Sequence, residues 1–293
     1  MRITNSIITR RSLEGMQRNL SAMEEAQRRV MSGLRIEKPS DDPAASVSIM
    51  GADRQLRALD QYGRNIDAAQ SRLSVEESAL DGLTGLLERA RELGLSQAGA
   101  TGTPQTRSLA KLEVDQLLSA AVGLGNTRFA GAYVFGGLYA DSAPLAADGT
   151  TSATRPPAGA APVEIDSGRQ VTVHHDALQV FVDTEAIAAL QDLSAALGAN
   201  SDAQLEAAVA RLDVAHGKVQ GVLGETGAFS AQLSVAKSNV EALGFTLQTF
   251  RSDLSEVEME EAISRLVARQ TAFQAALAAT SRIVSLTLSD YLR

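Results

Sequence analysis

The sequence contains no cysteine and no tryptophan, and aromatic residues make up only 4 % of its 293 positions. Without cysteine the chain has no disulfide scaffold, no thiol nucleophile and no cysteine metal site. Hydrophobic residues still reach 44 %, and Ala and Leu dominate among them. That composition favours helices packed against helices over a core built from aromatic rings.

Concentrated positive charge and long apolar runs are also missing. The net charge is −8, with Lys and Arg spread along the chain, so we predict no nucleic-acid partner. No stretch approaches the ~20 apolar residues of a membrane span, and we predict no membrane insertion. Because Arg10 and Arg11 are followed by polar residues instead of an apolar run, we expect that any export reads no cleavable signal.

Proline is scarce and clustered, which leaves long stretches free to be helical. We predict a helix over about residues 43–96, with Asp42 as its cap and Pro43 in its first turn. At ~1.5 Å per residue this helix would be roughly 80 Å long. The pair Thr103-Pro104 repeats the signal and predicts an antiparallel helix that ends near residue 127.

Apolar residues recur in steps of three and four at both ends of the chain. This heptad spacing requires a partner for each terminal helix, and the two terminal stretches are natural partners for each other. One helix pair buries too little surface to be stable alone, so we expect further partners from other copies. The predicted assembly seam consists of Leu13, Met16, Leu20, Met23, Val30, Ile263, Leu266, Phe273, Leu277 and Val284.

Composition changes in the middle of the chain. Residues 140–161 are rich in Ala, Pro, Thr and Gly, which is typical of a loop. Alternation around Asp166-Ser167-Gly168 predicts a β-hairpin, and residues 180–182 predict a further strand. We interpret residues 136–184 as a small β-rich insertion that faces outward. We expect that a short linker could replace residues 140–180 while the helical rod still folds.

Helix is predicted again from about residue 185. Capping boxes at Ser201 and Ser255 predict two more helix starts. Gly221, Gly224 and Gly227 lie inside the first of these helices and indicate either a bend or a close helix contact. The predicted fold is mainly α, a long antiparallel helical bundle or coiled coil formed by the N- and C-terminal segments. Its predicted domains are terminal coiled-coil helices (1–38 and 255–293), a helical rod (39–135 and 185–254) and the insertion (136–184).

No group of residues points to catalysis. His174-His175 could bind a metal, but the chain has only 3 histidines and no acidic cluster at ligand spacing, so a solvated strand end is the preferred interpretation. Asp41 and Asp42 could hold a cation, although capping of the following helix explains them more simply. We predict no catalytic residue, no cofactor and no metal, and therefore that the protein is not an enzyme.

Both ends of the sequence resemble the flagellin family. Ser32-Gly33-Leu34-Arg35-Ile36 followed by Pro39-Ser40-Asp41-Asp42-Pro43 is similar to the family's signature after its first helix. Leu254-Ser255-Glu256-Val257-Glu258 and the closing Leu288-Ser289-Asp290-Tyr291-Leu292 resemble its C-terminal part. One stretch departs from the family, with Phe229-Ser230-Ala231-Gln232 where a basic–Asn stretch is usual.

The resemblance covers about residues 1–140 and 205–293 and leaves out the insertion. It implies a structural subunit of the bacterial flagellum that is secreted unfolded through the type III apparatus. The terminal helices would line the inner tube of a ring of about one helical layer. The expected partners are copies of itself in that ring, a neighbouring hook-associated protein, flagellin and an export chaperone.

Within the family, three features favour a subunit that joins hook to filament over the filament subunit. They are the start Met1-Arg2-Ile3-Thr4, the placing of Pro39 and Pro43 around Ser40-Asp41-Asp42, and the run from Asn126-Thr127-Arg128-Phe129 to Tyr133-Val134-Phe135-Gly136-Gly137. Filament flagellin stays open as an alternative in the same class. A secreted helical effector or signalling protein is the alternative in a different class.

Overall fold

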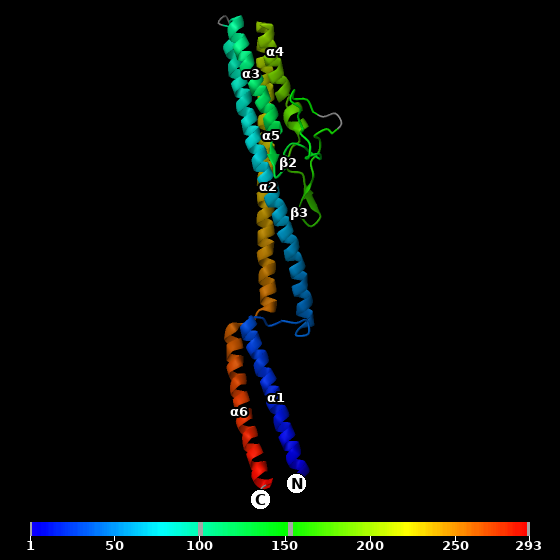
Figure 1. Ribbon diagram of the computed structural model, residues 1–293, viewed down its shortest axis with the longest axis vertical. Helices are drawn as coiled ribbons and strands as arrows, with labels where there is room; N and C mark the ends of the chain where they lie inside the picture. The colour runs from blue at the N-terminus through cyan, green and yellow to red at the C-terminus, as the bar shows by residue number, and fades with distance from the viewer. Residues whose placement is uncertain (1, 99–101, 152–154, 292–293) are drawn as a thin grey trace. The chain divides into compact units, whose positions relative to one another are not determined.

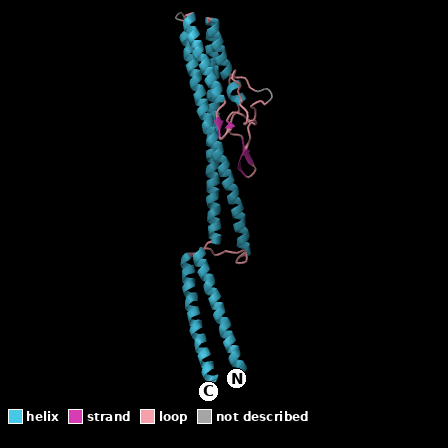
Figure 2. Cartoon of the chain, viewed as in Figure 1, coloured by secondary structure: helices cyan, strands magenta, loops and turns pink. Residues whose placement is uncertain are grey.

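Helices account for most of the chain in the computed structural model, which describes residues 2–98, 102–151 and 155–291 (Figure 1, Figure 2). For residues 2–6, 8, 9 and 283–291 the description is of the backbone. The α-helices are α1 (Arg2–Ser32), α2 (Pro43–Gln97), α3 (Pro104–Gly125), α4 (Ala186–Ala199), α5 (Asp202–Ser255) and α6 (Met259–Tyr291). The remaining elements are β1 (Arg128–Phe129), β2 (Ala132–Tyr133), β3 (Val163–Asp166), β4 (Arg169–Val171) and the π-helical turn η1 (Leu178–Val182).

The chain divides into two units. Unit 1 consists of Met1–Arg57 and Gly244–Arg293, and unit 2 is Ala58–Leu243. The mainly α fold class predicted from the sequence is confirmed, because the strands form only two two-stranded antiparallel ladders, β1 with β2 and β3 with β4, in the residues that the structure describes.

Short sequence signals start and stop the helices as predicted. The Asp42 carboxylate accepts a hydrogen bond from the backbone N–H of Ala45 at 3.0 Å, which caps α2. Thr103 forms a capping box with Thr106 at the start of α3. At the end of α1, Gly33 adopts a φ of 70°, a conformation that glycine reaches without steric strain.

One local prediction in the C-terminal half is wrong, and one of the two alternatives left open for the glycines is excluded. The hydroxyl of Ser255 donates to the carbonyl of Arg251 at 2.8 Å, so it caps no following helix, and α6 begins only at Met259. Gly221 and Gly224 lie inside α5, and a Cβ added at either would meet no atom within 4 Å. A close helix contact at these glycines is therefore absent from the described part of the chain.

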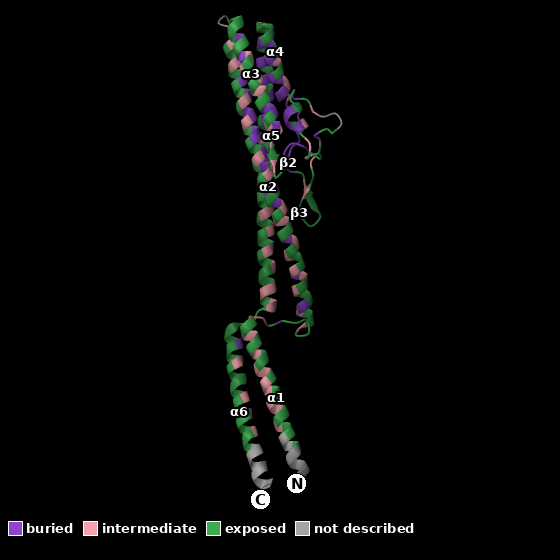
Figure 3. Ribbon diagram, viewed as in Figure 1, coloured by how far each residue is buried: buried purple, intermediate pink, exposed green. Residues whose placement is uncertain are grey.

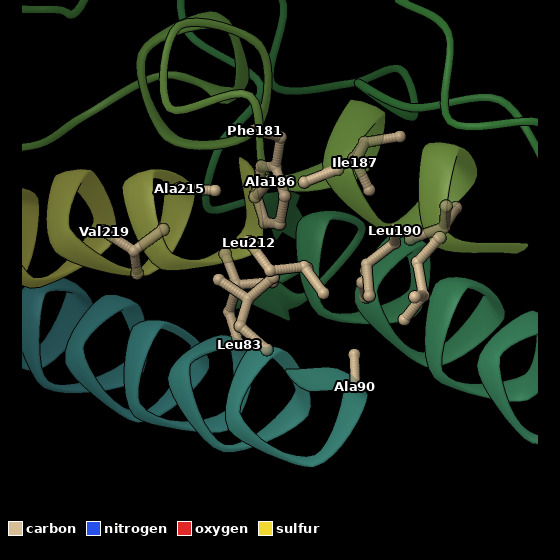
Figure 4. Close-up of a cluster of buried hydrophobic side chains, with 14 of the residues drawn as sticks. Leu83, Ala90, Phe181, Ala186, Ile187, Leu190, Leu212, Ala215 and Val219 are labelled. Atoms are coloured by element: carbon tan, nitrogen blue, oxygen red, sulfur yellow. The ribbon is translucent and has the colours of Figure 1, made fainter. Parts of the chain in front are cut away.

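The main core lies in unit 2, where α2, α3, α4 and α5 meet. Leu83 of α2 and Leu212 of α5 are fully buried, and Leu190 of α4 closes over them (Figure 4). Phe181 and Phe135 pack edge to face, with ring centroids 5.4 Å apart. A second cluster joins α2 and α5 to the β3–β4 hairpin and consists of Ile66, Ala69, Leu73, Ile165, Val173 and Leu233.

The middle segment is part of this core and contains little strand. The β3–β4 hairpin is present as predicted, but residues 180–182 belong to η1 and not to a strand. Leu145, Ile165 and Phe181 are each 2 % exposed or less, because they fill the space beside the helices. This packing argues against the expectation that a linker could replace residues 140–180 while the helical rod still folds.

Among the residues that the structure describes, no helix is both long enough and apolar enough to cross a membrane.

Candidate assembly surface

The two terminal helices of unit 1 lie side by side. α1 and α6 run antiparallel, with both chain ends at the same end of the pair (Figure 1). Their side chains are mostly exposed or half-buried (Figure 3). Among the described residues of unit 1, the buried apolar side chains are Ile36, Ala52 and Ala262. A unit with so few buried apolar side chains lacks the core that normally stabilises a helix pair.

Half of the predicted seam lies where the two helices face each other. The half-buried positions of α1 include Met16, Met23 and Val30, and those of α6 include Leu266 and Phe273. Their spacing of seven residues places each set on one face of its helix. These five side chains form the row that α1 and α6 share, and we call it the inner row.

The other seam residues form a second row on each helix. Leu13, Ile263 and Leu277 are between 44 % and 49 % exposed, and Leu20 is half-buried. At about 100° per residue they lie about 30° to 80° around their helices from the inner row, with Leu277 the nearest to it. Additional exposed residues near these rows are Met31, Met259 and Val267. We call this set the outer rows; the side chain of Val284, predicted for the seam, lies outside the described residues.

A short backbone bridge joins the stretch that follows α1 to the stretch that precedes α6. Leu34 and Glu256 form an antiparallel β-bridge. The N–H of Arg35 donates to the carbonyl of Ser255 at 2.7 Å, and the N–H of Val257 donates to the carbonyl of Gly33 at 3.0 Å. Both stretches carry the motifs that resemble flagellins. We did not predict this pairing from the sequence. The position of each motif next to a terminal helix is the sequence feature that could have indicated it.

The helix-start signature Pro39, Ser40, Asp41, Asp42 and Pro43 has a structural role in this bridge region. The Asp41 carboxylate accepts hydrogen bonds from the backbone N–H groups of Lys38 at 3.0 Å and Glu37 at 3.1 Å. These two bonds, that from Lys38 first, lower the pKa of Asp41. Asp42 caps α2 as predicted, whereas Asp41 bonds to the turn before the helix and does not cap it.

The histidine pair lies in unit 2, far in sequence from the terminal helices, and is not at a solvated strand end. His174 and His175 are 6 % and 5 % exposed, which corrects the prediction. His175 lies between Glu76 and Glu225. Nothing in the pattern of the sequence indicated this burial, because the carboxylate partners come from two distant helices. Within the described residues, no group of three or more His, Cys, Asp or Glu side chains could hold a metal ion.

Comparison with known proteins places these features in a family. Residues 3–140 match the bacterial flagellin N-terminal helical region, and residues 209–292 match the bacterial flagellin C-terminal helical region. The chain belongs to the flagellin family. The two matched regions contain α1 and α6 almost entirely, together with the bridge residues that connect them to α2 and α5.

Individual flagellin-family relatives match nearly the whole length of the chain. The flagellar hook-associated protein 3 of Escherichia coli is 24 % identical, over 98 % of each chain. The flagellin of Bacillus subtilis is 28 % identical, over 95 % of this chain and 94 % of its own. Among solved structures, the flagellar hook-associated protein 3 of Legionella pneumophila has a TM-score of 0.61 at 14 % identity, over 70 % of this chain and 98 % of its own. At that identity the structural likeness shows a shared fold.

Proposed function

We propose that this protein is a structural subunit of the extracellular bacterial flagellum that joins the hook to the filament. The observation that carries the proposal is the incomplete packing of α1 and α6 within a chain of the flagellin family. Outer-row side chains such as Ile263 and Leu277 stay about half exposed, although the same helices pair through their inner rows. Exposed apolar rows on otherwise polar helices are typical of surfaces that other chains cover.

Assembly would supply the missing layer. Copies of the chain arranged in a ring would place the outer rows of one α1–α6 pair against those of the next. Such closed rings arise when the same two surface patches meet around a rotation axis. The neighbouring partners are a hook-associated protein on one side and flagellin on the other. Export through the type III apparatus with an export chaperone belongs to the same proposal, since the chain must leave the cell before it assembles.

The junction role is favoured over the filament role by particular residues. The chain matches the hook-associated protein 3 of Escherichia coli over 98 % of that protein's length, and Pro39 and Pro43 bracket the signature where filament subunits usually have other residues. Filament flagellin is the second candidate, because the flagellin of Bacillus subtilis also matches over 94 % of its length. Copy number distinguishes the two, since a junction subunit is scarce and a filament subunit is abundant.

Deletion of the gene tests the junction proposal. The expected phenotype is intact hooks without filaments, with monomeric flagellin released into the medium. Electron microscopy of the deletion strain and an immunoblot of the medium give both readouts. A filament subunit would instead leave no secreted flagellin of its type, and a secreted effector would leave swimming unchanged. Normal filaments in a strain without a second gene copy would refute the proposal.

A further inference from the structure

A buried histidine joins the middle segment of unit 2 to both of its long helices. The Nδ1 atom of His175 lies 2.7 Å from a carboxylate oxygen of Glu76 on α2. Its Nε2 atom lies 3.1 Å from a carboxylate oxygen of Glu225 on α5. The backbone N–H of His175 lies 3.4 Å from both Glu76 oxygens, and the Thr226 hydroxyl donates to Glu76 at 3.3 Å.

Only the protonated imidazole can satisfy both carboxylates. A neutral imidazole has one N–H donor, whereas the imidazolium has two. With His175 neutral, either Glu76 or Glu225 loses its donor. If Glu76 loses it, the Thr226 hydroxyl and the His175 backbone N–H remain, but Glu76 is 0 % exposed and no solvent replaces the shorter bond, which is unfavourable. If Glu225 loses it, that side chain is 67 % exposed and is solvated, but the charge-assisted contact across the segment is lost.

The surroundings of the imidazole have opposing effects on its protonation. Burial alone would lower the pKa of His175, but the hydrogen bonds and negative charges of Glu76 and Glu225 outweigh it and raise the pKa above its ordinary value. The ring of Phe229 on α5 packs against the imidazole with centroids 5.3 Å apart. Next to it in the chain are His174, on which the charge of Arg72 of α2 acts, and Asp176, which accepts a hydrogen bond from the backbone N–H of Gly159.

We propose that His175 is a pH-dependent clip that holds residues 155–177 against α2 and α5 and releases them when it loses its proton. What it holds is an apolar contact, because Ile165 and Val173 of this segment pack on Ile66, Leu73 and Leu233 of the two helices. Val163 and Val171 of the segment pack against the same cluster, and Asn65 of α2 donates to the carbonyl of Glu164 at 3.0 Å. Release would therefore uncover the second hydrophobic cluster while α2 and α5 stay helical.

The neighbouring His174 also sets a lower pH limit for holding the segment. Burial, followed by the charges of Arg72 and His175, lowers the pKa of His174 to about 4. A group with a lowered pKa in the folded state loses stability as pH falls below its ordinary value, about 6.5 for histidine. A group with a raised pKa loses stability as pH rises above that value. The two histidines therefore oppose each other, and residues 155–177 are held most firmly between their two midpoints, near pH 6.5.

Hydrogen exchange of the full-length chain between pH 5 and 9.5 tests the clip, with the three histidines titrated in parallel by NMR. Protection factors of residues 160–177, corrected for intrinsic exchange, should fall above neutral pH, while those of α3 stay constant. The size of the fall is about tenfold for each pKa unit by which His175 exceeds 6.5. The His175 midpoint should lie above about 6.5, the ordinary value for histidine. His216, whose ring lies 3.3 Å from a carboxylate oxygen of Glu88, is the control position.

Three variants make the test decisive. His175→Gln should lower the protection of residues 160–177 and remove its alkaline fall. Glu225→Gln removes a charge from a side chain that is 67 % exposed, so the chain folds, and the fall should begin at a lower pH. His216→Gln is the matched control and should leave the profile unchanged. A His175 midpoint at or below about 6.5, or an identical alkaline fall in His175→Gln and the unmodified chain, would overturn the proposal.

Discussion

Unit 1 and unit 2 are built from helices of the same kind, yet only unit 2 encloses a core. In unit 2, α2 and α5 are covered by α3, α4 and the middle segment, so side chains such as Leu83 and Leu212 are 0 % exposed. In unit 1, α1 and α6 have only each other along most of their length, and their inner rows stay half-buried. The difference shows that heptad spacing specifies which helices pair, whereas further layers decide whether the pair is stable alone.

The largest effect should come from removing the layer that covers unit 2. We expect that exchanging residues 140–180 for a Gly/Ser linker abolishes the cooperative thermal unfolding of unit 2, because Leu145, Ile165 and Phe181 leave the core. Circular dichroism melting measures the change. Ser167→Ala, at the exposed hairpin turn, is the matched control and should melt like the unmodified chain. A linker variant that melts cooperatively at an unchanged temperature would contradict the expectation.

Removal of a single phenylalanine side chain should show the same difference between the two units, with a smaller effect. Phe181→Ala removes a side chain that is 1 % exposed and should lower the free energy of unfolding by about 3–5 kcal/mol. Phe245→Ala, in unit 1, removes one that is 75 % exposed and should change it by about 0.5 kcal/mol or less. Urea titration of both variants measures the difference. Equal losses would show that Phe245 is buried in solution.

Two glycines of unit 1 should respond with opposite signs. Gly33→Ala places a Cβ on a residue with a φ of 70° and should destabilise unit 1 by about 1 kcal/mol. Gly15→Ala, inside α1 with no atom within 4 Å of the new Cβ, should stabilise that helix by about 1 kcal/mol. Hydrogen-exchange protection of residues 10–32 reports both. Equal changes of one sign would mean that the end of α1 is not defined by Gly33.

The smallest effect on the monomer is expected for a charge in an outer row. Leu277→Asp should change the unfolding of the isolated chain by about 0.5 kcal/mol or less, because the side chain is already 49 % exposed. In the assembled ring the same charge would be buried at a cost on the order of several kcal/mol. The variant should therefore fold and still fail to restore motility to a deletion strain.

Ala275→Asp is the matched control for that experiment. Ala275 is exposed and lies on a different face of α6 at about 100° per residue, away from both the inner and the outer row. The Ala275→Asp variant places the same charge on the same helix and should restore swimming to the deletion strain. Motility with Leu277→Asp would show that the outer row stays uncovered in the assembled flagellum.

Helix starts with local signals were predictable, and contacts made by distant residues were not. The pair Asp42 and Pro43 located the start of α2, because capping depends on neighbouring backbone groups. The capping box predicted at Ser255 does not form, because the Ser255 hydroxyl donates to the carbonyl of Arg251 within α5. The heptads identified the seam but could not tell the inner row from the outer rows, as both are apolar. The burial of His175 depends on Glu76 and Glu225, which only the folded chain brings together.

The bridge near Leu34 and Glu256 also constrains the order in which the molecule can fold. The Arg35 side chain donates to the carbonyl of Leu254 from 219 positions away, so closing this contact in an unfolded chain costs the entropy of a very long loop. Pairing of α2 with α5 in unit 2 shortens that loop, because it draws together the chain on either side. We therefore expect α1 and α6 to meet last during refolding. A chain that emerges N-terminus first would hold α1 unpaired until its final residues arrive.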